Sequence, residues 1–115
     1  MDKMFDFGTQ MAEAELWAKQ FLSGKSFRGE VIGADSFETE DGFHFTVDTC
    51  WVNDIQAYET AIKESNMDWV VVDRFNTSSE AKAIHHYWIQ KIKNEGVRFF
   101  KSLQDGCTYG VMKED

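Results

Sequence analysis

Side chains that can act as an acid, a base or a nucleophile gather between positions 44 and 50. His44, Asp48 and Cys50 offer an imidazole, a carboxylate and a thiol on one side of an alternating segment. At about 3.3 Å per residue, His44 and Cys50 lie about 20 Å apart along a strand, whereas a nucleophile and its base must be about 3 Å apart. A catalytic dyad would need a partner from another element. The same stripe is also typical of the solvated or half-covered face of an antiparallel sheet.

Two further candidate groups, His85 and His86, are adjacent in a predicted helix. Neighbouring helical residues point about 100° apart, so the pair cannot hold one metal ion side by side. His85 follows Ala81 by four positions and borders the apolar stripe, which favours a hydrogen-bonded residue at the core edge. The chain contains no HExxH, no GxSxG and no glycine-rich phosphate loop. The sequence therefore predicts no metal, no cofactor and no catalytic residue.

The segment that positions His85 is a strand leading directly into a helix. Three consecutive valines, residues 70–72, favour a strand, and simple alternation places Trp69, Val71, Asp73 and Phe75 on one face. Thr77 and Glu80 then have the spacing of a capping box, in which the Glu80 carboxylate reaches back to the Thr77 amide.

The helix continues with apolar residues at helical spacing and is predicted to end at Gly96. Before this segment, the patterns predict a first helix at Gln10–Leu22, a bulged strand around Glu30–Ala34 and an acidic turn at Glu38–Gly42. Two further strands are predicted at Phe43–Val52 and Gln56–Lys63. After the helix, the chain is predicted to form a strand or short helix at Val97–Leu103 and a last strand at Thr108–Met112. We expect one α+β domain over residues 1–115, an antiparallel sheet of about four strands with two helices packed on one face.

Seven residues are candidates for binding a ligand or partner. Glu59 and Arg74 lie on alternating strands, where they can pair across the sheet or hold a ligand. The chain has more aromatic residues than one sheet face needs, and surplus aromatic residues in a small domain indicate a binding or oligomer surface. The complete set of candidates is Glu59, Arg74, His85, Tyr87, Trp88, Phe99 and Phe100.

The charge of the chain limits its partners. Twelve basic and twenty acidic residues give a formal charge of −8, which argues against binding nucleic acid or an anionic membrane surface and permits attraction of basic partners. No signal peptide or membrane span is predicted, so we expect the protein in the cytosol. Cys50 and Cys107 lack any metal-ligand spacing and are expected to be reduced thiols.

Several segments together carry a family resemblance. They are WAKQF (Trp17–Phe21), VDTCWV (Val47–Val52), YETAI (Tyr58–Ile62) and DRFNTSSEAKAIHHYW (Asp73–Trp88). The chain over Trp17–Trp88 resembles a group of small proteins encoded in bacteriophage genomes and prophages. The chain departs from the group at Ile84, which replaces a glycine, and at Asn53–Gln56, a loop shorter than the corresponding loop of the group. The matching positions are Thr49, Glu59, Thr60, Arg74, Phe75, Thr77, Glu80, Ala81 and His85. The resemblance implies phage origin and no particular reaction.

Three functional interpretations follow. The first is a small acidic, non-enzymatic phage accessory protein that binds, and so inhibits, a host protein in the host bacterial cytosol. The second is a module that sequesters a small ligand such as a nucleotide signal, held between subunits of a homo-oligomer by Arg74, His85 and Trp88. The third is an enzyme that uses Cys50 and His85 with Glu59 or Asp48.

Overall fold

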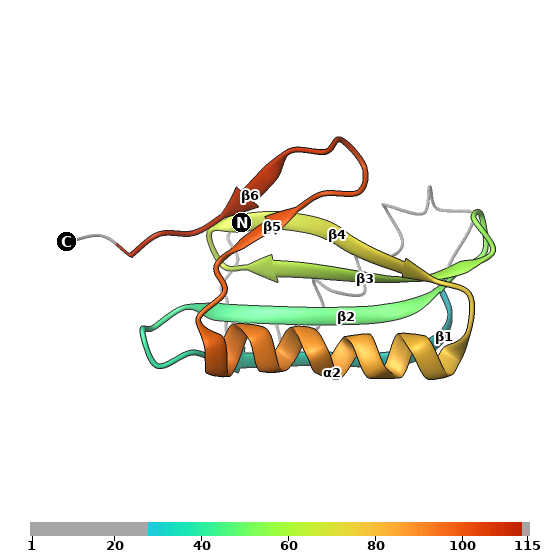
Figure 1. The fold of residues 1–115 in the computed structure, drawn as a ribbon, viewed down its shortest axis with the longest axis horizontal. Helices are drawn as coiled ribbons and strands as arrows, with labels where there is room; N and C mark the ends of the chain where they lie inside the picture. The colour runs from blue at the N-terminus through green and yellow to red at the C-terminus, as the bar shows by residue number, and fades with distance from the viewer. Residues whose placement is uncertain (1–27, 114–115) are drawn as a thin grey trace, which may run out of the picture.

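The computed structural model describes residues 28–113, which form one helix and six strands. Four antiparallel strands form the main sheet in the order β1-β2-β3-β4, and α2 lies across one face of it, alongside β1 and β2 in Figure 1. The bounds are β1 Arg28–Glu38, β2 His44–Val52, β3 Ala57–Glu64, β4 Met67–Phe75, α2 Ser78–Glu95, β5 Phe99–Lys101 and β6 Thr108–Gly110. The α+β class and the four-stranded antiparallel sheet are confirmed. The predicted helix at Gln10–Leu22 lies outside the described residues.

The chain from 97 to 112 forms a separate β5–β6 hairpin instead of joining the main sheet. Figure 1 shows this hairpin beside β4, at the side of the sheet away from β1. The Leu103 amide donates to the Val71 carbonyl at 2.9 Å and so ties the hairpin to β4. Of the two predictions for Val97–Leu103, the strand is confirmed.

Bulges determine which side chains of the edge strands face α2. The register of β1 shifts twice between Arg28 and Gly33, which confirms the predicted bulge. In β4 the pairing passes from Asp73 opposite Thr60 to Val71 opposite Ala61, which leaves Val72 as an extra residue. An extra residue reverses the alternation, so Val71 packs with Trp69 on one face whereas Asp73 contacts α2. The prediction that Asp73 shares a face with Val71 is wrong for this reason.

Helix α2 begins and ends where its sequence predicts. The Thr77 hydroxyl accepts from the Glu80 amide at 3.2 Å, and it also donates to the Glu80 carboxylate, which therefore does not reach the Thr77 amide as expected. Gly96 has φ 69°, and the Val97 amide donates to the Lys91 carbonyl at 3.1 Å. The Gly96 amide donates to the same Lys91 carbonyl, so the left-handed glycine ends the helix. Among the described residues, no helix is long and apolar enough to cross a membrane.

The main core lies between the sheet and α2 and continues under the hairpin. Phe45, Val47 and Ile62 from the sheet meet Ile92 from α2 and Phe100 from β5, and all five are buried. The rings of Phe45 and Phe100 meet edge to face at 5.9 Å. The hairpin is therefore fixed to the domain by burial of its inner face.

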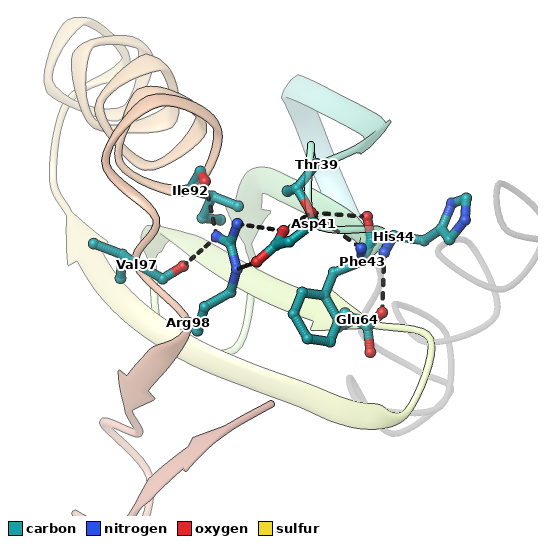
Figure 2. A network of polar contacts seen from close by, with 8 residues as sticks. All are labelled: Thr39, Asp41, Phe43, His44, Glu64, Ile92, Val97 and Arg98. Carbon is teal, nitrogen blue, oxygen red and sulfur yellow. Dashed lines mark hydrogen bonds and ion pairs between the residues drawn. The ribbon is translucent and has the colours of Figure 1, made fainter. Parts of the chain in front are cut away.

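Arg98 joins the end of α2 to the turn between β1 and β2. Its guanidinium donates to the Ile92 and Val97 carbonyls at 2.8 and 2.9 Å and to the Asp41 carboxylate at 2.8 and 3.2 Å, as Figure 2 shows. The Thr39 hydroxyl donates to the same carboxylate at 2.6 Å. Arg98 lowers the pKa of Asp41 from 3.8 to about 2, with the Thr39 hydrogen bond as the next cause.

This contact predicts a pH dependence of stability. Because the pKa of Asp41 is lower in the folded protein than its ordinary value of 3.8, the ionised carboxylate stabilises the fold above about pH 4 and loses that effect as the pH falls through about 2. Asp41→Asn should therefore lower the urea midpoint at about pH 7, and its deficit relative to wild type should shrink toward about pH 2. Glu40→Gln, in the same turn, is the control. A deficit that stays constant over this range would contradict the contribution of the contact.

Candidate functional site

A line of hydrogen bonds runs through the interface between α2 and the sheet. His85 Nε2 lies 2.7 Å from a carboxylate oxygen of Asp35, and Nδ1 lies 2.7 Å from the hydroxyl of Thr49. The Thr49 hydroxyl in turn lies 2.7 Å from that of Thr60. With a neutral ring, Nε2–H donates to Asp35, and the Thr60 and Thr49 hydroxyls donate in sequence toward Nδ1. Every polar atom of the imidazole is thereby satisfied in a largely buried position.

Gly33 makes room for this imidazole. A Cβ atom at Gly33 would lie 2.6 Å from His85 Nε2, which is closer than such atoms approach. The sequence predicts a bulge that contains Gly33, but it does not connect Gly33 with His85, because the two residues are far apart along the chain. Asp35 and the two threonine hydroxyls were likewise not assigned to His85. Only the three-dimensional pairing of β1 with β2 brings them together.

The hydrogen-bonded order of hydroxyl, imidazole and carboxylate is the order found in nucleophile triads. Thr49 is fully buried, however, and so is Thr60. A substrate atom cannot reach the Thr49 hydroxyl unless α2 moves away from the sheet. The arrangement as it stands holds the helix against the sheet.

The residues considered for thiol chemistry point in different directions. Thr49 contacts His85, so its neighbour Cys50 projects from the opposite face of β2. Cys50 is paired with Glu59 across the sheet, and it does not meet His85. Asp48 and Cys50 are fully buried whereas His44 is exposed, so of the two alternatives for this stripe the half-covered face fits and the solvated face does not. Cys50 and Cys107 are both thiols, as expected.

Glu59 and Arg74 form the cross-strand ion pair that the sequence predicts. Arg74 donates from Nε and Nη2 to one Glu59 oxygen, at 3.1 and 2.6 Å. The Glu59 side chain is 4% exposed and that of Arg74 is 45% exposed. The second Glu59 oxygen accepts no hydrogen bond from the described part of the chain. Because Glu59 shares its face with Cys50, Arg74 lies on the opposite side of the sheet from His85 and Trp88, so the three residues do not meet within a single chain.

Two of the four aromatic candidates belong to the core. Phe100 is fully buried, and Trp88 packs against it with ring centres 5.8 Å apart while donating its indole N–H to Asp73 at 2.7 Å. The position of Phe100 favours a structural role, whereas Trp88 lies partly buried at the edge of the core. Tyr87 and Phe99 are exposed, as a binding role requires.

Exposed apolar side chains concentrate on the β5–β6 hairpin. Among the described residues, seven large hydrophobic side chains are exposed, and four of them come from residues 99–112. We call these four the hairpin surface: Phe99, Leu103, Tyr109 and Met112. Phe99 is 52% exposed and Met112 is 73% exposed. Of these four residues, only Phe99 was among the candidates from the sequence. A strand of three residues is too short for alternation to separate inward from outward positions.

No cluster of three or more His, Cys, Asp and Glu side chains within the described range has the arrangement of a metal site. No protein-family model, curated protein or solved structure matches the chain. The fold and these surfaces define a small α+β domain that combines a closed helix–sheet interface with an exposed apolar hairpin.

The close approach of Gly33 to His85 predicts non-additive substitutions. Gly33→Ala should destabilise the protein by about 1–3 kcal/mol, since the methyl group displaces the imidazole. His85→Ala should cost a similar amount, about 1–3 kcal/mol, because it leaves a buried hydroxyl without its partner. The stability loss of the double variant, measured by urea denaturation, should be smaller than the sum of the two single losses by about 1 kcal/mol or more.

The matched control is His86→Ala, which removes the exposed neighbouring imidazole. Its effect should add to that of Gly33→Ala within about 0.5 kcal/mol. If the stability losses of His85→Ala and Gly33→Ala were also additive, the two residues would not compete for space.

Proposed function

We propose that the protein is a non-enzymatic accessory protein of bacteriophage type that binds a host protein in the host cytosol and inhibits it. The observation that carries this proposal is the hairpin surface. Solvent-exposed aromatic and methionine side chains are enriched where proteins bind other proteins. The resemblance over Trp17–Trp88 supports the phage origin, because it rests on several separate segments.

The hairpin presents its exposed side chains on a fixed base. Phe100 and Val111 bury the inner face, and the Leu103 amide binds the Val71 carbonyl. Phe99, next to Phe100 in β5, projects from the outer face. A surface that is already ordered loses little conformational entropy on binding, which favours a stable complex.

The charge of the chain favours a basic partner. A formal charge of −8 attracts positively charged proteins at long range and raises their association rate. The apolar contact would then supply the slow dissociation. An inhibitor needs this combination, because it must find its target quickly and remain bound.

The proposal predicts that the hairpin surface is needed to retain the partner. The tagged protein should retain one bacterial protein from lysate in near-equal amount. The Phe99→Ala/Met112→Ala variant should retain it at least about tenfold less, since central apolar contacts contribute about 2 kcal/mol or more each. Both side chains are more than half exposed, so the variant should fold with an unchanged melting temperature.

Val31→Ala and Ile55→Ala are the matched controls, because they shorten exposed apolar side chains on β1 and on the β2–β3 turn. Both should retain the partner fully. Undiminished retention by the hairpin variant would contradict the assigned surface. A wild-type protein that retains nothing and instead forms a dimer through the hairpin would contradict the function.

A further inference from the structure

A cleft opens between the start of β4 and the turn of the β5–β6 hairpin. It has a volume of about 210 Å³. Its walls include the side chains of Asp68, Trp69, Asp105 and Tyr109, with Ser102 at the base of the turn. Tyr109 is one of the four residues of the hairpin surface, and its pairing with Phe100 places it on the face of the hairpin opposite Phe99. The cleft thus lies on the same hairpin through which we propose the protein binds its partner. The inference below rests on that proposed function.

The ionisable groups of the cleft are acidic. Asp68 is exposed, and its carboxylate has no hydrogen bond or ion pair within residues 28–113. The Tyr109 hydroxyl donates to the Asp105 carboxylate at 2.5 Å, and this bond, followed by that from the Cys107 amide, lowers the pKa of Asp105. The lowered pKa keeps Asp105 ionised at neutral pH.

Among residues 28–113, no basic side chain lines the cleft to offset the two aspartates. The nearest basic residue along the hairpin, Lys101, is paired with Thr108, one position away from the Phe100–Tyr109 pair. Successive residues of a strand point to opposite faces, so Lys101 projects from the face of the hairpin opposite Tyr109. The negative charge of the cleft is thus open to a ligand.

Two aromatic side chains, Trp69 and Tyr109, also line the cleft, together with Val70, Ser102 and Gln104. The hydrogen bond to Asp105 raises the pKa of Tyr109 to about 12, so its ring remains a neutral phenol whose proton is already engaged with Asp105. Aromatic faces attract cations, and Arg in particular stacks on them while its planar fork donates to carboxylates.

We propose that this cleft binds a guanidinium group, and specifically an arginine side chain of the protein partner. The volume admits one long side chain, the two carboxylates supply acceptors, and the two rings supply stacking faces. In the complex the arginine lies beside the apolar contact of the hairpin surface. The cleft therefore adds specificity for a basic partner to an otherwise apolar interface.

The test uses capped tripeptides and the full-length protein labelled with ¹⁵N. Acetyl-Gly-Arg-Gly-amide should shift the Trp69 indole signal and the Asp105 and Tyr109 amide signals saturably, with a dissociation constant in the millimolar range. The citrulline peptide, which keeps the shape and lacks the charge, should bind at least about tenfold more weakly. Trp69→Phe identifies the indole signal.

Asp68→Asn should weaken binding of the arginine peptide at least about threefold, because it removes one carboxylate that has no partner among the described residues. Glu40→Gln is the matched control, since it removes one exposed negative charge from the β1–β2 turn, separated from β4 by β3. The control should bind like wild type. Equal binding of both peptides, or equal loss in both variants, would overturn the proposal.

The source of the guanidinium is tested with propylguanidine, a free guanidinium compound that carries the same single charge as the arginine peptide. Tighter binding of propylguanidine than of the arginine peptide would assign the cleft to a diffusible small molecule and overturn the partner assignment. Failure of these titrations is separate from failure of the proposed function. Retention of a lysate protein that depends on Phe99 and Met112 but is unchanged in Asp68→Asn would contradict the cleft alone.

Discussion

The arrangement of the described domain depends on one buried imidazole. His85 lies between Asp35 on β1 and Thr49 on β2, and it reaches them only because Gly33 leaves the space. Leaving this buried polar group without its partners would cost more free energy than the hydrogen bonds themselves contribute. The contact therefore specifies one position of α2 on the sheet. Apolar contacts alone tolerate small shifts of a helix, whereas a ring held at both nitrogens does not.

The hydrogen-bonded positions are also the positions of the family resemblance. Thr49, Thr60 and His85 form one line, and Glu59 with Arg74 forms a pair on the other face of the same strands. These contacts give the residues a structural role that requires no reaction.

Local sequence patterns account for most of the main sheet and for α2. The Thr77 cap, the Gly96 end and the Glu59–Arg74 pair follow from spacing alone, since each depends on neighbouring residues or on simple alternation. The face of Asp73 could not be predicted, because one extra residue at Val72 reverses the alternation without any proline or glycine to mark it. The partners of His85 and the cleft beside Trp69 depend on contacts between distant segments, which a single sequence does not reveal.

The hairpin can present an interaction surface because the contacts that hold it are made elsewhere. Arg98, just before β5 begins, binds the Ile92 carbonyl of α2 and the Asp41 carboxylate, and Phe100 then enters the core. These contacts use the inner face of the hairpin and the residue before it. Phe99 and Met112 are more than half exposed, so their burial within the described domain supplies only part of the stabilisation that full burial would give. Under the proposed function, a protein partner covers these exposed apolar surfaces.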